Sequence, residues 1–78
     1  MQPVEFLRSV SDGTRVVIRY SLPTGQATDA LGYLSGSDDA ACVVATARGL
    51  VTVQYATVIA AKEVPPPPAP RIRRPADS

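Results

Sequence analysis

Apolar and polar residues alternate with a period of two over much of this chain, which is typical of β-strands with one buried face. The clearest case is residues 15–20 (RVVIRY), which follow the turn signal Ser-Asp-Gly at 11–13. In a strand, Arg15, Val17 and Arg19 share one face and their neighbours occupy the other. The pattern therefore predicts a strand at 15–20 with its apolar face toward a core.

Four further segments have the length and β-branched composition of short strands, and turn signals rich in Gly, Pro, Ser and Asp separate them. We expect these strands at residues 29–35, 41–46, 51–54 and 58–62. Gly32 interrupts the first of them, which predicts either a β-bulge or a close approach of backbones. Residues 54–57 are expected to form one 3₁₀ turn. Around Phe6 and Leu7 the sequence permits a short strand or one helical turn.

Five short strands at intervals of roughly 8–12 residues predict an all-β fold, either a small antiparallel barrel or a sandwich. With about 60 ordered residues, a folded chain hides only ~60% of its unfolded surface, which favours a single compact barrel. A barrel also leaves little open strand edge for mispairing. We therefore expect one β-barrel domain over residues 1–63.

A second region, residues 64–78, differs in composition and charge. It holds six of the eight prolines in the chain. Because proline lacks an N–H and fixes φ, we expect a disordered, extended Pro/Arg-rich linker or tail. Residues 1–63 carry five basic and six acidic side chains, whereas residues 64–78 carry three arginines and one aspartate. The three arginines, which form a candidate electrostatic arm, are Arg71, Arg73 and Arg74.

Composition excludes several classes of function. The chain has no histidine, which removes Ser-His-Asp and Cys-His catalysis and most zinc sites. No cluster of residues indicates a metal site, a cofactor or an enzyme active site. The net charge of +1 and the four aromatic residues argue against nucleic acid as the partner. Neither a signal peptide nor an uninterrupted apolar span is present, so we expect a cytoplasmic protein without a membrane segment.

Three polar or reactive groups in the strand region are interpreted as structural. Cys42 lies among small apolar residues without an adjacent basic group to lower its pKa, so we expect a core position. Asp38 and Asp39 follow Ser-Gly-Ser, and adjacent carboxylates in this setting are typical of a turn rather than of an acid–base pair. Asp29 is expected to bond nearby backbone N–H groups in an Asx turn.

The candidate interaction residues lie on predicted strands. Arg15 and Arg19 form a basic strip that could contact phosphate, although the weak net charge favours a solvated outer face with arginine stems covering Val17. Thr52 and Gln54 form a second exposed polar face on the fourth strand. These four residues are the candidate interaction surface.

Five segments, in their order and spacing, resemble the N-terminal SH3-like domain of actinobacterial GNAT-family N-acetyltransferases. They are residues 13–20 (GTRVVIRY), 27–32 (ATDALG), 46–49 (TARG), 51–53 (VTV) and 58–62 (VIAAK). The resemblance covers residues 10–66 and implies a five-stranded SH3-like barrel with a 3₁₀ turn before its last strand. It also implies a non-catalytic accessory domain that positions or docks a GNAT catalytic domain, present in cis or in trans.

The acetyltransferase chemistry itself is not expected in this chain. The acetyl-CoA loop of that superfamily follows a Gln/Arg-x-x-Gly-x-Gly/Ala pattern, in which backbone amides at a helix start bind the pyrophosphate. No such pattern occurs here. The alternative hypothesis is a free-standing β-barrel module that binds RNA or a protein partner.

Overall fold

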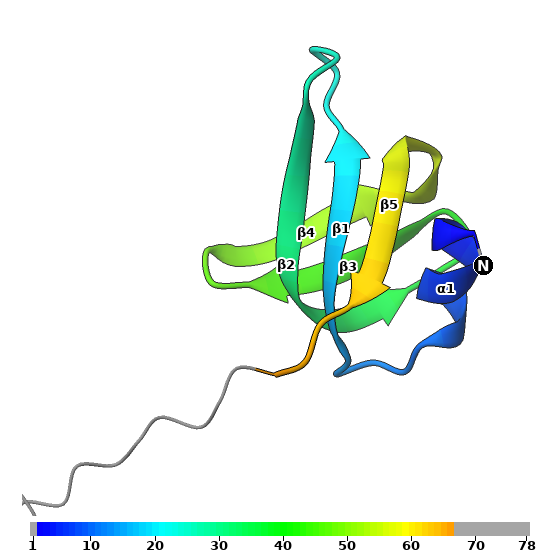
Figure 1. Ribbon diagram of the computed structural model, residues 1–78, viewed down its shortest axis with the longest axis vertical. Coiled ribbons are helices and arrows are strands. Elements are labelled where there is room, and N and C mark those ends of the chain that lie inside the picture. The colour runs from blue at the N-terminus through cyan, green and yellow to red at the C-terminus, as the bar shows by residue number, and fades with distance from the viewer. Residues whose placement is uncertain (1, 67–78) are drawn as a thin grey trace, which may run out of the picture.

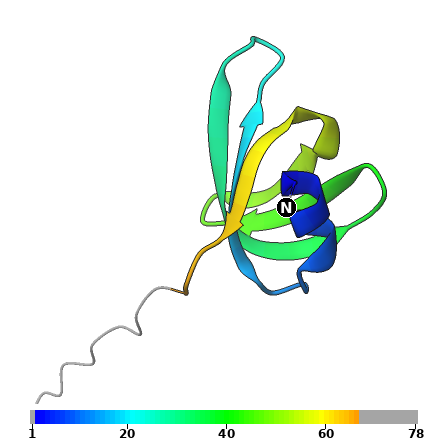
Figure 2. The same cartoon turned by 45° about the vertical axis from the view of Figure 1, so that its right-hand side comes forward.

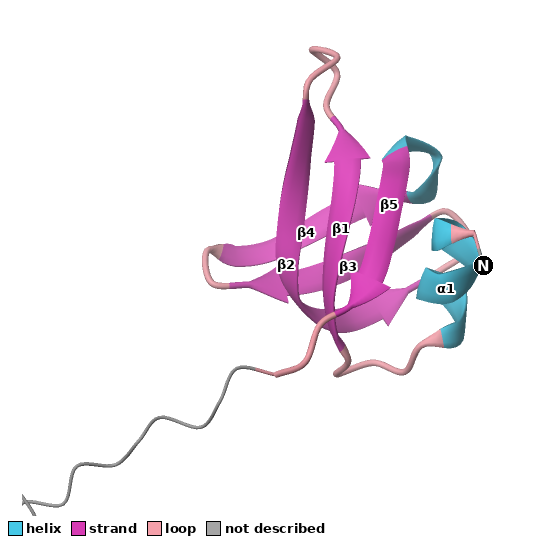
Figure 3. Cartoon of the chain, in the orientation of Figure 1, coloured by secondary structure: helices cyan, strands magenta, loops and turns pink. Residues whose placement is uncertain are grey.

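The computed structural model describes residues 2–66 of the 78-residue chain. All five predicted strands are present; the third matches its predicted bounds, and the others extend by one or two residues at one or both ends (Figures 1 and 3). The elements are α1 (Pro3–Ser9), β1 (Arg15–Ser21), β2 (Ala27–Ser37), β3 (Ala41–Thr46), β4 (Gly49–Gln54), the 3₁₀ turn η1 (Tyr55–Thr57) and β5 (Val58–Glu63).

The strands form one antiparallel sheet in the order β4-β3-β2-β1-β5. Figure 1 shows β2, β1 and β5 in one layer, with β3 and β4 crossing behind them. Strand β2 joins the two layers, because its N-terminal part pairs with β1 and its C-terminal part pairs with β3. The sheet is thereby bent into a small barrel-like fold, which confirms the predicted all-β class.

Gly32 lies where β2 passes very close to β3. A Cβ atom on Gly32 would overlap the carbonyl oxygen of Ala45 and lie 2.7 Å from its carbonyl carbon. Of the two predicted alternatives at this glycine, the structure shows the close backbone approach. The irregularity in the β2–β3 register falls between Leu34 and Gly36, so the bulge is a separate feature further along the strand.

The N-terminal segment forms a seven-residue helix, α1, which is one of the two predicted alternatives and longer than one turn. Pro3 occupies the start of the helix, where its missing N–H is harmless. Glu5 lies in the first turn and Arg8 in the last, which suits the helix dipole. The helix packs beside β5 at the open side of the bent sheet, where Leu7 enters the core (Figure 2).

Arg8, in the last turn of α1, contacts two other parts of the fold, the turn before β3 and η1. Its Nη2 donates a hydrogen bond to the backbone oxygen of Asp39, in the turn before β3, at 2.9 Å. The guanidinium carbon also lies 5.2 Å from the centre of the Tyr55 ring, within the range of a cation–π contact. These contacts hold α1 against the turn before β3 and against η1.

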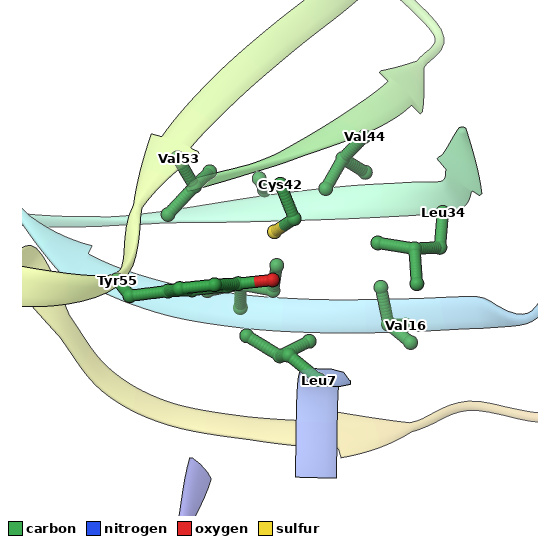
Figure 4. Packing of buried hydrophobic residues seen from close by; sticks show 9 residues of the cluster. Leu7, Val16, Leu34, Cys42, Val44, Val53 and Tyr55 are labelled. Carbon is green, nitrogen blue, oxygen red and sulfur yellow. The ribbon is translucent and has the colours of Figure 1, made fainter. Parts of the chain in front are cut away.

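The core is aliphatic apart from one aromatic ring and one thiol (Figure 4). Strand residues point into it from β1 to β4, and those of β1, Val16 and Ile18, are the ones that the alternation predicted. Its buried members are Leu7, Val16, Ile18, Ala30, Leu34, Cys42, Val44, Val53 and Tyr55. Cys42 is fully buried, and this burial raises the pKa of its thiol, which agrees with the predicted core position. The Tyr55 hydroxyl is buried without a hydrogen-bond partner among the described residues.

Candidate interaction surface

The outward-facing side chains of four neighbouring strands form a continuous apolar row. Cross-strand pairing sets Val17 beside Leu31, Tyr33 beside Ala45, and Ala45 beside Leu50. Leu31 and Tyr33 are two residues apart in β2 and therefore lie on the same face of this strand. The row is thus unbroken from β1 to β4. We call these five residues the outer face. Leu31, Tyr33 and Leu50 are 45%, 42% and 71% exposed, which makes them three of the four exposed large apolar residues among residues 2–66.

Four basic side chains line grooves that border this outer face. Arg19 and Lys62 border a groove that also contains Val17, and Arg15 borders a second groove beside Leu31 and Tyr33. Arg48, in the β3–β4 turn, borders a third groove with Leu31. We call Arg15, Arg19, Arg48 and Lys62 the basic rim. The three grooves are open, with volumes of about 320, 350 and 500 Å³ respectively.

One acidic residue, Asp29, lies within this surface. Its Oδ1 is 3.8 Å from Nη1 of Arg19, its cross-strand partner, and both side chains are more than half exposed. Such a pair contributes about 0–1 kcal/mol to stability. The predicted Asx turn at Asp29 is wrong, because β2 begins two residues earlier, at Ala27. Asp29 is therefore a mid-strand residue whose side chain meets Arg19.

The predicted basic strip of Arg15 and Arg19 lies on one face of β1, but the two arginines make different contacts. Arg15 Nη1 donates a hydrogen bond to the Pro65 backbone oxygen at 2.8 Å. The Val64 N–H donates to the Arg15 backbone oxygen, also at 2.8 Å. Arg15 thus fixes the point at which the chain leaves the barrel, whereas Arg19 pairs with Asp29.

Thr52 and Gln54 are exposed on β4, as predicted, and pair with Val43 and Ala41 of β3. They belong to the edge strand at the other end of the sheet order from β1 and β5. The structure therefore does not gather the four candidate residues into one cluster. Whether Thr52 or Gln54 binds a partner stays a prediction.

The residues that sequence reasoning missed are the exposed apolar ones of β2 and β4, namely Leu31, Tyr33 and Leu50. Leu31 and Tyr33 alternate with the buried Ala30 and Leu34, so a strict period of two over β2 already placed them outward. Leu50 was missed because β4 was predicted to begin after it. Only the β3–β4 register, with Ala45 opposite Leu50, joins it to Tyr33.

The aspartate pair at 38–39 forms a turn, as predicted. One carboxylate oxygen of Asp38 accepts hydrogen bonds from the backbone N–H groups of Ala40 and Ala41, both at 2.8 Å. These bonds favour the charged form and lower the pKa of Asp38. Asp39 contributes its backbone oxygen to Arg8. Among residues 2–66, no three Cys, Asp or Glu side chains gather as a metal site requires.

We expect Asp38→Ala to lower the free energy of unfolding at neutral pH, because two turn N–H groups lose their acceptor. Since the folded pKa lies below the unfolded value of about 3.8, the carboxylate stabilises the fold above that value. This stabilisation is lost as the pH falls through the folded pKa. Urea unfolding of both proteins should show a constant difference above about pH 5 that shrinks below about pH 4.

Asp39→Ala is the matched control, since it removes the adjacent carboxylate and keeps the backbone oxygen that Arg8 uses. It should leave stability almost unchanged from neutral to acidic pH. An equal loss in both variants, or a loss in Asp38→Ala that persists at low pH, would contradict the role assigned to the Asp38 carboxylate.

The predicted electrostatic arm lies outside the part of the chain that the structure describes. Its residues are Arg71, Arg73 and Arg74, and most of the proline run lies outside as well. The role predicted for this arm therefore stays a prediction.

Within the described part of the chain, no helix is long and apolar enough to span a bilayer.

The strand order and the bent sheet define a small five-stranded barrel-like β domain. The family model described as "Rv0428c N-terminal Sm-like domain" matches residues 10–62, and the chain belongs to this family. No curated protein and no solved structure matches it. The family match thus supports the prediction of a small β domain, which the family description calls Sm-like. The match does not link this chain to acetyltransferases.

Proposed function

We propose that this chain is a non-catalytic interaction domain whose outer face docks onto another protein domain. The observation that carries the proposal is the exposed row of Leu31, Tyr33 and Leu50, connected through Ala45 across three strands. Apolar residues in a contiguous exposed patch, rimmed by polar groups, are typical of protein–protein contacts. Tyr33 is well suited to such a contact, since tyrosine is enriched at the centre of interfaces.

The partner that we propose is a GNAT-family catalytic domain, in cis or in trans. The support is the resemblance of residues 10–66 to the N-terminal domain of such enzymes. The description of the matching family also names an N-terminal domain. In the protein for which the family is named, further sequence therefore follows this domain. Because the acetyl-CoA loop pattern is missing from the sequence, we assign catalysis to the partner and no cofactor to this chain. We place the complex in the cytoplasm.

Photo-crosslinking from the outer face tests this function. A benzophenone amino acid replaces Leu50, which is 71% exposed, and the protein is irradiated in its native cells. The crosslinked protein is identified by mass spectrometry and assayed for acetyl transfer from acetyl-CoA. The same probe at Gln26, in the exposed β1–β2 turn, is the control position. We expect an acetyltransferase to be captured from position 50 and not from position 26.

The result separates the parts of the proposal. Capture of a protein without acetyltransferase activity would overturn the partner assignment. Equal labelling from both positions would overturn the docking face, and acetyl transfer by purified residues 1–78 alone would overturn the non-catalytic role. The intact mass of the native polypeptide, measured in the same cells, distinguishes a partner in cis from one in trans.

An RNA-binding module is the alternative, and the basic rim around Tyr33 is the observation that favours it. Binding to RNA would weaken steeply with rising salt, because each neutralised phosphate releases a counterion. Removal of residues 71–74 would then reduce the slope of affinity against salt. A docking domain should show no RNA affinity of this kind.

A further inference from the structure

The charges of the domain are distributed unevenly between its two sides. Four of the five basic side chains among residues 2–66 belong to the basic rim. Of the six acidic side chains in the same range, Asp29 alone lines these grooves. The other acidic residues lie on α1, in the turns and at the end of β5: Glu5, Asp12, Asp38, Asp39 and Glu63. The basic rim and Asp29 together therefore place a local excess of three positive charges around the outer face, in a domain that is close to neutral.

The grooves give this surface a shape as well as a charge. Leu31 borders two of them, and Val17 borders the third, so apolar side chains from a partner have recesses beside both residues. Each groove is also lined by at least one side chain of the basic rim. A ligand that fits must therefore present apolar side chains toward Leu31 and negative charges toward the rim.

We propose that the outer face binds an acidic amphipathic segment of the partner protein, with its apolar side chains beside Leu31 and its carboxylates facing the basic rim. This inference rests on the proposed docking function and specifies the chemistry of the docked surface. Arg15 is held by its hydrogen bond to Pro65, and Arg19 is paired with Asp29. Arg48 and Lys62, which border the grooves at the other positions of the rim, are therefore the two charges best placed to meet carboxylates.

Charge argues against the other occupants of this face. A second copy of the chain would bring one basic rim against another, and residues 64–78 carry a net charge of +2. A different observation argues against RNA, which would find only one exposed aromatic residue among residues 2–66, Tyr33, where single-strand binders use several for base stacking.

The test titrates the ¹⁵N-labelled 78-residue chain with synthetic peptides. The first peptide has about 14 residues, enough for four helical turns, with leucines spaced three and four apart and glutamates on the flanks. The second has the same composition with the leucines dispersed, and the third replaces every glutamate by lysine. A single-stranded RNA oligonucleotide is the fourth ligand. Amide shifts at Leu31, Tyr33 and Ala45 report occupancy of the outer face.

We expect the acidic amphipathic peptide alone to shift these amides in a saturable manner. Arg48→Gln should weaken its binding roughly two- to five-fold, as loss of one exposed ion pair does. Gln26→Glu changes the net charge of the protein by the same amount at a distant turn and should leave binding unchanged. Leu31→Ala removes an exposed side chain without touching the core, and it should weaken binding about ten-fold or more.

Equal or tighter binding of the lysine peptide would overturn the proposal, as would saturable binding of the RNA at these amides. If no peptide binds while crosslinking from position 50 captures a protein, docking stands and the acidic partner surface is wrong. If the acidic peptide binds as expected while crosslinking captures no acetyltransferase, this inference stands and the catalytic partner is wrong.

Discussion

Gly32→Ala is expected to lower the free energy of unfolding by about 3 kcal/mol or more, a large fraction of the stability of so small a domain. The added Cβ would overlap the Ala45 carbonyl oxygen. This Cβ is fixed directly to the backbone of β2, and the carbonyl oxygen belongs to the backbone of the paired strand β3. Neither backbone can move away without disturbing the β2–β3 ladder. Thermal unfolding followed by circular dichroism should show a melting temperature lower by more than about 12 °C.

Gly36→Ala is the matched control for this prediction. Gly36 lies in the same strand, and a Cβ there would meet nothing within 4 Å. This variant should unfold within about 1 kcal/mol of the parent protein. A Gly32→Ala protein as stable as Gly36→Ala would show that β2 and β3 separate more easily than the structure indicates.

Leu7→Ala is expected to destabilise the domain by about 2–5 kcal/mol, because Leu7 is a fully buried leucine and truncation leaves a cavity. Leu50→Ala makes the identical chemical change at a leucine that is 71% exposed and should change stability by less than about 0.5 kcal/mol. Urea unfolding of both variants measures the difference.

The Leu7 result bears on where the domain begins. The family match starts at residue 10, after α1, although Leu7 belongs to the same core cluster as Val16 and Val53. A large loss in Leu7→Ala would show that the helix is a part of the folding unit. Equal stability of the Leu7→Ala and Leu50→Ala proteins would show instead that α1 contributes little to the core.

The strands were predictable because one physical signal dominates them. Alternation over residues 15–20 places one face in the core, and the structure buries Val16 and Ile18 accordingly. Residues 41–46 were predictable from their β-branched and small apolar composition. The turn at 38–39 was predictable from Asp and Ser chemistry. The close approach at Gly32 was predictable because glycine weakens a strand, so an isolated one within a strand often marks a bulge or a place where another backbone comes near.

The helix α1 and the outer face were harder to predict, for different reasons. Seven residues are too few to establish a period of 3.6, so a strand and a helical turn stayed equally open at Phe6 and Leu7. The outer face depends on register. Tyr33, Ala45 and Leu50 lie far apart in sequence, and only strand pairing sets them side by side. The Asp29 prediction failed because local turn chemistry was considered without the β1 partner, Arg19.

The hydrogen bonds of Arg15 with Val64 and Pro65 also affect how strong the docking contact must be. Arg15 is the cross-strand partner of Tyr33, so the chain leaves the barrel at the margin of the outer face. A catalytic domain joined in cis through residues 64–78 would meet that face as an intramolecular partner, and short flexible linkers give such partners effective concentrations in the millimolar range. A contact with millimolar affinity between separate molecules would then be substantially occupied within one chain.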